Sequence, residues 1–164
     1  MTIHVHSPAG EPLLIMTRRF SAPREAVWKV MTEPELVKRW YGGHGFTNPR
    51  CEMDVRPGGR WSHVMRTPDG QEFSAQFVFL EVVPPERLVW RSADFETSSG
   101  PHCNVMTVTL TEADEPERTD WRLVVRFKSL GDREAAGAIG FADVLAQGCE
   151  RVEALVRQRP REVA

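Results

Sequence analysis

The sequence has few of the residues that build disulfide or metal frameworks. Its three cysteines, Cys51, Cys103 and Cys149, are an odd number and form no Cys-x-x-Cys pair, so neither a disulfide framework nor a zinc knuckle is indicated. His4 and His6 flank one valine, but no cysteine or carboxylate stands beside them. We therefore expect no metal site, no cofactor and a reducing, cytoplasmic setting.

Long apolar runs and an excess of one charge are also missing. Nowhere do eighteen apolar residues follow one another, and the N-terminus lacks the basic-then-apolar pattern of a signal peptide. The 21 basic and 23 acidic residues give a formal net charge of −2. Without a large field to attract phosphates or anionic lipids, neither nucleic acid nor a membrane is an expected partner.

Motifs for nucleophilic or nucleotide chemistry are absent as well. The sequence contains no Gly-x-Ser-x-Gly elbow, no phosphate-binding loop and no dinucleotide fingerprint. Ser62 precedes His63 directly, and neighbouring residues of a strand point to opposite faces of a sheet. No catalytic residue is assigned.

What the chain does have is the composition of an ordinary globular domain, with 41% hydrophobic and 27% charged residues in a length of 164. That length fits one domain with a substantial core. Residues 1–11 are polar and without period, which predicts a flexible N-terminal tail before a single domain over residues 12–164.

The hydrophobic pattern predicts seven strands and three helices. A strand at 13–20 precedes Ser21-Ala22-Pro23, a helix start because proline suits the first helical turn, and a second short helix follows at 34–40. An alternating pattern then continues to residue 128, interrupted by proline- and glycine-rich turns. The remaining strands are expected at 50–56, 60–66, 72–83, 87–95, 104–112 and 119–127, and short turns between them imply antiparallel neighbours.

The first hairpin has a register that its chemistry suggests. A three-residue loop, Pro57-Gly58-Gly59, would place Val55 opposite Trp61 and Met53 opposite His63, with both glycines at positive φ. One face of this hairpin is then apolar except for His63. The other face carries charged residues and belongs in water.

The strand at 72–83 is apolar on both faces, since Phe77 and Phe79 have one parity and Val78 and Leu80 the other. Two explanations remain open. Either a helix covers one face and a second subunit the other, making a homodimer possible, or a bulge shifts the register.

One long helix is expected from Asp132 to about Gln158. Its second half carries apolar residues at helical spacing from Phe141 to Val156. Its first half is rich in glycine and alanine, including Gly137 and Gly140, which suggests a cavity beside this end of the helix.

Several stretches resemble one known family. They are Ala22-Pro23 with Val27-Trp28, Thr32 to Trp40, Asp54 to Trp61, Asp69-Gly70 and Glu81 to Trp90. Together, in this order, they resemble the activator of heat-shock-protein-90 ATPase homologue (AHSA1-like) family of the SRPBCC, START and birch-pollen-allergen superfamily. Where family members often carry Gly-Trp, this chain has Gly148-Cys149.

The resemblance implies an α+β helix-grip fold, in which a seven-stranded curved antiparallel sheet, with two short helices after its first strand, wraps a long C-terminal helix. It also implies a scaffold for a small apolar or aromatic molecule held in a cavity between sheet and helix. The glycines at 42, 43 and 45 would form a mobile lip around Tyr41 and His44.

The residues expected to line that cavity are mostly aromatic, with His63 and Ser92 as polar anchors. They are Trp40, Met53, Trp61, His63, Met65, Phe77, Phe79, Trp90, Ser92, Phe141 and Leu145. His63 could instead be a satisfied core histidine. Two other functions stay open: an enzyme of the polyketide cyclase or aromatase type, and a protein-interaction or stress-response module that acts as a dimer.

Overall fold

Eight strands form one antiparallel sheet in the order β1-β2-β8-β7-β6-β5-β4-β3. The computed structural model describes the backbone of residues 2–163 and the side chains of residues 2–158. The strands are β1 (His4–His6), β2 (Leu13–Phe20), β3 (Thr47–Met53), β4 (Arg60–Arg66), β5 (Glu72–Val83), β6 (Arg87–Ser92), β7 (Asn104–Glu112) and β8 (Thr119–Phe127).

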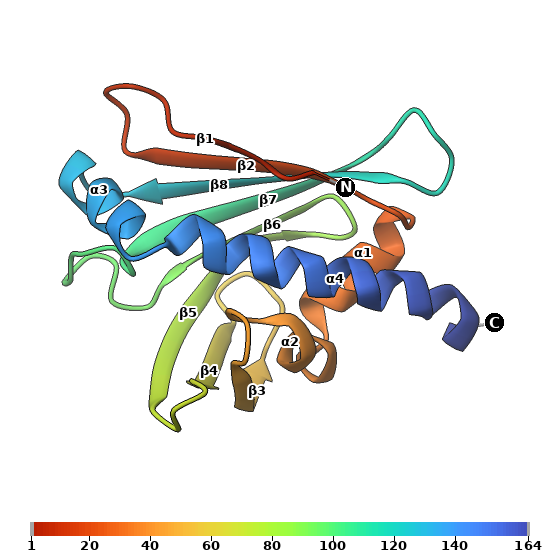
Figure 1. Ribbon diagram of the computed structural model, residues 1–164, viewed down its shortest axis with the longest axis horizontal. Coiled ribbons are helices and arrows are strands. Elements are labelled where there is room, and N and C mark those ends of the chain that lie inside the picture. Colours follow the sequence, from red (N-terminus) through yellow and green to blue (C-terminus); the bar gives the residue numbers. More distant parts are fainter. Residues whose placement is uncertain (1, 164) are drawn as a thin grey trace.

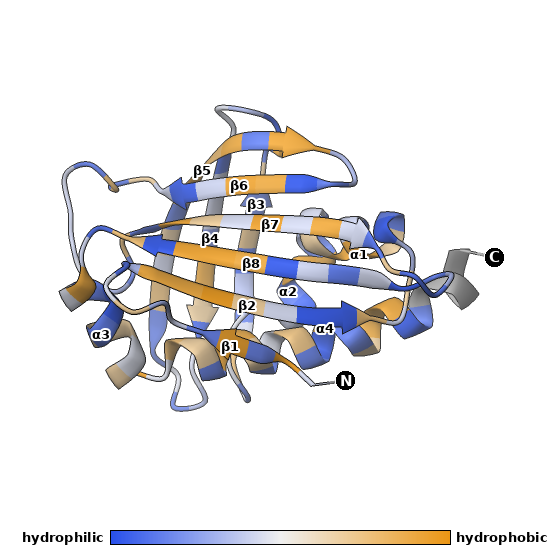
Figure 2. Cartoon of the chain, turned by 90° about the horizontal axis from the view of Figure 1, so that it is seen from above, coloured by the Kyte–Doolittle hydropathy of each residue, from blue (hydrophilic) through white to orange (hydrophobic). Residues whose placement is uncertain are grey.

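Within residues 2–163, four helices lie on one side of this sheet. They are α1 (Arg24–Thr32), α2 (Pro34–Trp40), α3 (Leu130–Ala138) and α4 (Phe141–Val163). The sheet curves around α4, with α1 and α2 beside the helix (Figure 1). Viewed from above, β2 is hydrophobic along its first half and hydrophilic near its end, where Arg18 and Arg19 lie (Figure 2). No helix within residues 2–163 is long and apolar enough to cross a bilayer.

The sheet has one strand more than the sequence predicts. Residues His4–His6 form β1 and pair with β2, so that Val5 lies opposite Met16. The prediction of seven strands is wrong because β1 is an edge strand whose three residues are all exposed. An exposed edge strand has no buried face to impose an alternating pattern.

The predicted single long helix is divided in two. α3 ends at Ala138 and α4 begins at Phe141, with Gly140 between them at a φ of 73°. A positive φ is incompatible with a continuing right-handed helix and is easily adopted by glycine. Gly140, which in the sequence suggested a cavity beside the helix, therefore forms the turn between α3 and α4.

The register of the first hairpin differs from the prediction by two residues. Met53 lies opposite Trp61 and Cys51 opposite His63, because the loop is longer than the three residues assumed. A shift of two keeps every side chain on its predicted face. Trp61 and His63 therefore still point inward, and both are buried.

β5 contains the bulge that one of the two explanations predicts. The pairing with β6 is irregular between Phe79 and Glu81, so the inward position changes from Phe79 to Val82, which packs against the core. Phe77 and Phe79 are buried, whereas Phe73, Leu80 and Val83 are 50%, 42% and 44% exposed.

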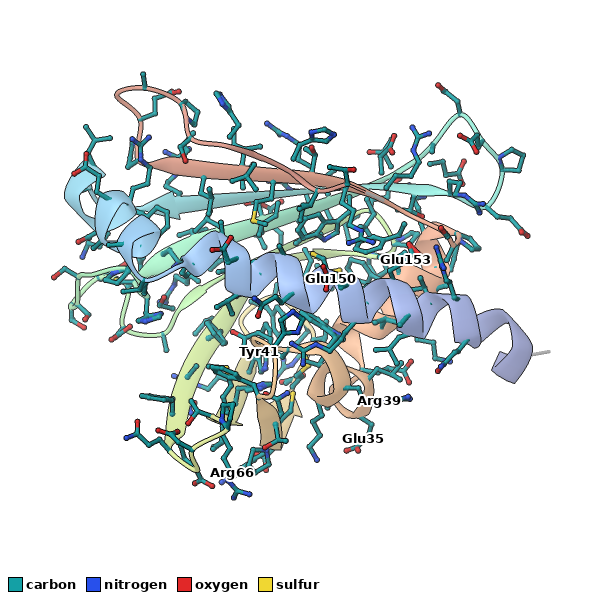
Figure 3. The ribbon with its side chains drawn as sticks, viewed as in Figure 1. Glu35, Arg39, Tyr41, Arg66, Glu150 and Glu153 are labelled. Carbon is teal, nitrogen blue, oxygen red and sulfur yellow. The ribbon has the colours of Figure 1, made fainter. Side chains whose placement is uncertain are left out.

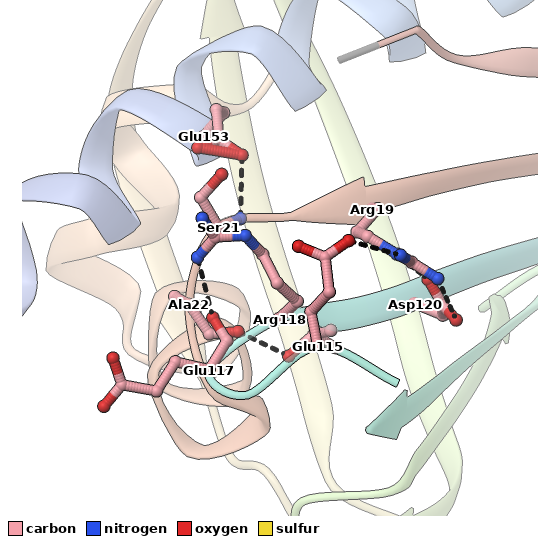
Figure 4. A network of polar contacts seen from close by, with 9 residues as sticks. Arg19, Ser21, Ala22, Glu115, Glu117, Arg118, Asp120 and Glu153 are labelled. Atoms are coloured by element: carbon pink, nitrogen blue, oxygen red, sulfur yellow. Dashed lines mark hydrogen bonds and ion pairs between the residues drawn. The ribbon is translucent and has the colours of Figure 1, made fainter. Parts of the chain in front are cut away.

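The second half of α4 is tied to the end of β2 by a buried carboxylate. Glu153 is 6% exposed and accepts hydrogen bonds from the backbone N–H of Ser21 at 3.0 Å and from Arg157 Nε at 2.8 Å. Close by, Thr119 Oγ1 donates to the carbonyl oxygen of Ala22 at 2.7 Å. These contacts join helix, strand and the start of α1 at one point (Figure 4).

Candidate functional site

Aromatic side chains from three strands surround Trp61 on the inner face of the sheet. Its ring centroid lies 4.7 Å from that of Phe77, 6.1 Å from Phe79 and 5.6 Å from Trp90. Such contacts add stability beyond the area they bury. Four of the predicted cavity residues thus form one contiguous cluster, contributed by β4, β5 and β6.

His63 is hydrogen-bonded through both ring nitrogens. Trp61 Nε1 donates to His63 Nδ1 at 3.2 Å, and His63 Nε2 lies 2.7 Å from Asn48 Oδ1. The amide nitrogen of Asn48 donates to the carbonyl oxygens of Lys38 and Tyr41 at 2.8 and 2.9 Å. Its oxygen must therefore accept from His63, and the imidazole is neutral with its proton on Nε2.

Tyr41 completes this cluster. Its ring centroid lies 4.3 Å from that of His63 and 5.5 Å from that of Trp61, and the residue lies between α4 and the half of the sheet that holds β3, β4 and β5 (Figure 3). Burial raises the pKa of the Tyr41 phenol and raises the pKa of the Cys51 thiol to about 11. Both groups are therefore uncharged at neutral pH.

The pKa of His63 is lowered from 6.5 to about 4, first by burial and second by the positive charge of Lys38. Between these two values the unfolded chain binds a proton that the folded chain does not, so stability falls as the pH drops. We expect a loss of about 2 kcal/mol in the free energy of unfolding between neutral pH and about pH 4.5.

Urea unfolding of the wild type and of His63→Gln at both pH values checks this expectation. The variant lacks the titrating group but keeps every carboxylate, so its loss on acidification should be smaller by about 2 kcal/mol. Equal losses in the two proteins would show that His63 does not titrate as described.

The other predicted residues occupy different places. Trp40 Nε1 donates to the carbonyl oxygen of Val30 at 2.9 Å, which holds the end of α2 against α1. Ser92 Oγ donates to the carbonyl oxygen of His102 at 2.8 Å and accepts from the backbone N–H of Asn104 at 3.0 Å. Met53, Met65 and Leu145 are half-buried.

Phe141 lies away from the Trp61 cluster, at a small pocket near the start of α4. Its ring contacts Phe127 and His102 at centroid distances of 5.7 and 6.4 Å. The pocket has a volume of about 140 Å³ and is lined by Val5, Ser7, Leu14, Phe127, Arg133, Ala136, Gly137, Phe141 and Ala142. Trp61 and His63 are not among these residues.

The glycine-rich loop after α2 is fastened to α4. Arg151 Nη2 donates to the carbonyl oxygens of Gly42 and Gly43, the latter at 2.8 Å. The backbone N–H of His44 donates to Gln147 Oε1 at 2.8 Å. The loop that the sequence suggests as a mobile lip is thus held by side chains from two successive turns of the helix.

Sequence reasoning missed Asn48 and Arg18. Asn48 precedes Pro49, a pair typical of turns, and nothing in its neighbourhood indicates a bond to His63. Arg18 points inward from β2, because every second residue of this strand, Arg18 included, is buried. A charged residue at an inward position was the available signal.

A curved antiparallel sheet closed around one long C-terminal helix defines a helix-grip fold of the ligand-binding type. The family model described as "Activator of Hsp90 ATPase homolog 1-like protein" matches residues 21–152. The chain therefore belongs to this AHSA1-like family, as the sequence predicts. No curated protein matches the chain.

Solved structures with the same fold come from several bacteria. Protein NE0264 from Nitrosomonas europaea has a TM-score of 0.84 at 25% identity, covering 94% of this chain and 99% of its own. A protein from Rhodobacter sphaeroides has a TM-score of 0.82 at 20% identity, covering 95% and 98%. An AHSA1-like protein from Aeromonas hydrophila has a TM-score of 0.67 at 23% identity, covering 85% and 92%.

Proposed function

We propose that this chain binds a small apolar or aromatic molecule between the inner face of the sheet and α4. The observation that carries the proposal is the pocket of about 140 Å³ beside Phe141. Its lining combines aromatic and aliphatic side chains with the small residues Ala136, Gly137 and Ala142. The exposed residues Val5 and Ser7 also line it, so the pocket opens to the surface and a ligand can enter it.

The affinity expected for a ligand of that size is modest. Burying about 150 Å² of apolar ligand surface contributes about 4 kcal/mol, which corresponds to a Kd of about 1 mM. Tighter binding would need a larger ligand or a polar contact. Natural ligands of this chain are therefore expected to extend beyond the pocket.

The polar anchors expected from the sequence have partners within the protein. His63 uses both nitrogens and Ser92 uses its hydroxyl, so we infer that the ligand lies in the pocket beside Phe141 instead. The same bonds leave His63 no free lone pair, which favours binding over acid–base chemistry of the polyketide cyclase type. Pairing of two copies through the exposed apolar residues of β5 stays a prediction.

Ala142→Leu tests the proposal by filling the pocket. Toluene should bind the wild type with saturable shifts of the NMR signals of residues 136–142, and the leucine side chain should weaken this binding at least about tenfold by occupying its volume. Ala154→Leu is the matched control, because Ala154 is exposed on the same helix.

Unchanged binding in Ala154→Leu together with loss in Ala142→Leu would support the site. If toluene binds Ala142→Leu as well as the wild type, or shifts signals around Trp61 and leaves those around Phe141 in place, the pocket is not the binding site.

A further inference from the structure

Arg18 is a buried cation without an ion-pair partner among the described residues. The residue is 8% exposed, its Nε makes no hydrogen bond, and no described carboxylate oxygen lies within 4.0 Å of its guanidinium. Its Cζ lies 5.1 Å from the centre of the Phe20 ring, a cation–π contact that stabilises the charge but does not neutralise it. A buried charge is normally paired.

Two other arginines with a buried Nε differ from Arg18, because each has polar partners for its guanidinium. Arg24 and Arg151 each have a buried Nε without a hydrogen bond. Arg24 nevertheless has carboxylate oxygens of Glu86 and Glu112 at 3.5 and 3.6 Å, and Arg151 donates to two loop carbonyls. Arg18 has neither kind of contact with any side chain or carbonyl that the structure describes.

The pocket and Arg18 lie at two ends of one seam between β2 and α4. On β2, Leu14 lines the pocket, and Arg18 follows on the same inward face about 13 Å further along the strand. On α4, Ala142 lines the pocket, and Cys149 comes about 10 Å further along the helix. Strand and helix run in the same direction (Figure 1).

Cys149 lies close to Arg18. Burial raises the pKa of its thiol to about 12, and the charge of Arg18 acts in the opposite direction. Between Ala142 and Cys149 the same face of the helix presents Leu145 and Ala146, and both side chains are partly buried. Met16 faces them from β2, and its unbranched side chain can change rotamer to admit a chain.

We propose that this seam binds an amphipathic carboxylate, with its apolar end in the pocket beside Phe141 and its carboxylate paired with Arg18. A guanidinium presents two parallel N–H donors that match the two oxygens of a carboxylate. A phenyl ring in the pocket followed by an extended stem of about six carbon atoms, together with the hydrogen bond to the guanidinium, spans roughly the 13 Å from pocket to arginine. The inference rests on the proposed apolar pocket and adds the chemical class of the ligand.

The experiment compares phenylhexanoate with phenylhexanol by isothermal titration calorimetry, using the wild type, Arg18→Met and Arg122→Met. The two probes differ only at the end that should meet Arg18. Arg122 is exposed on the neighbouring strand β8 and faces away from α4, so it controls for loss of one positive charge. Toluene is titrated in parallel to report the pocket alone.

We expect the wild type and Arg122→Met to bind the carboxylate at least about tenfold more tightly than the alcohol. In Arg18→Met this preference should disappear while the alcohol binds as before. Circular dichroism of Arg18→Met should match that of the wild type, and Arg18→Lys, which keeps the charge without the paired donors, should retain part of the preference.

Equal affinities for both probes in the wild type, or a carboxylate preference that survives in Arg18→Met, would overturn the assignment of Arg18. Toluene binding would then still leave the apolar pocket in place. Failure of all three probes to bind the wild type would refute the pocket itself and the inference with it.

Discussion

Replacing His63 by alanine is expected to lower the free energy of unfolding by about 4 kcal/mol. The substitution removes the acceptor for the Trp61 indole N–H and the donor to Asn48 Oδ1. Both partners are buried and would remain without a hydrogen bond. The vacated volume next to Tyr41 adds the cost of a cavity.

Equilibrium unfolding in urea measures this loss, and His102→Ala serves as its control. His102 is exposed, so the control should differ from the wild type by less than about 0.5 kcal/mol. If His63→Ala were as stable as His102→Ala, the hydrogen bonds of His63 would not support the fold. That result would support the sequence-based prediction that His63 binds the ligand.

Replacing Gly59 by alanine is expected to cost about 3 kcal/mol. A Cβ atom on Gly59 would lie 1.9 Å from the backbone oxygen of Asp54 and 3.0 Å from that of Arg56. Relief requires the backbone of the loop to move. The loop is bonded to β5 by Gly58 N–H to Phe79 O at 2.8 Å and Phe79 N–H to Gly59 O at 2.9 Å.

Gly58→Ala is the matched control for this prediction. Gly58 has a φ of 82° but open space around the position of a Cβ, so its cost is the backbone strain of about 1 kcal/mol. Thermal and urea unfolding of the two variants should therefore rank Gly59→Ala well below Gly58→Ala. The reverse order would mean that backbone dihedrals, and not the close approach, decide the choice of glycine.

The two glycines also show how far local reasoning reaches. The sequence predicts a turn at Pro57-Gly58-Gly59 with positive φ at both glycines; this is confirmed for Gly58 and wrong for Gly59, whose φ is not positive. Gly59 is required for another reason, its closeness to the oxygen of Asp54. A distance between backbone segments depends on how the loop closes, so no local pattern could predict it.

In the candidate site, too, the sequence predicts some features and not others. Alternation along the strands predicts that Trp61 and His63 share an inward face, because parity survives even a two-residue error in register. The partner of His63 could not be predicted, since Asn48 comes from an irregular part of β3 and from a turn-like stretch of sequence. The same holds for Arg18, whose lack of a counter-charge follows from the elements packed around it.

By itself the sequence determined the periodic features of this protein: the inward faces of the strands, the short helices, the turns and, through its motifs, the family. These depend on residues within a few positions of one another. The tertiary structure decided which groups meet across the sheet and α4, where the edge strand β1 pairs, and which buried charge lacks a partner. Those outcomes depend on packing between segments far apart in the chain, and so on the whole fold.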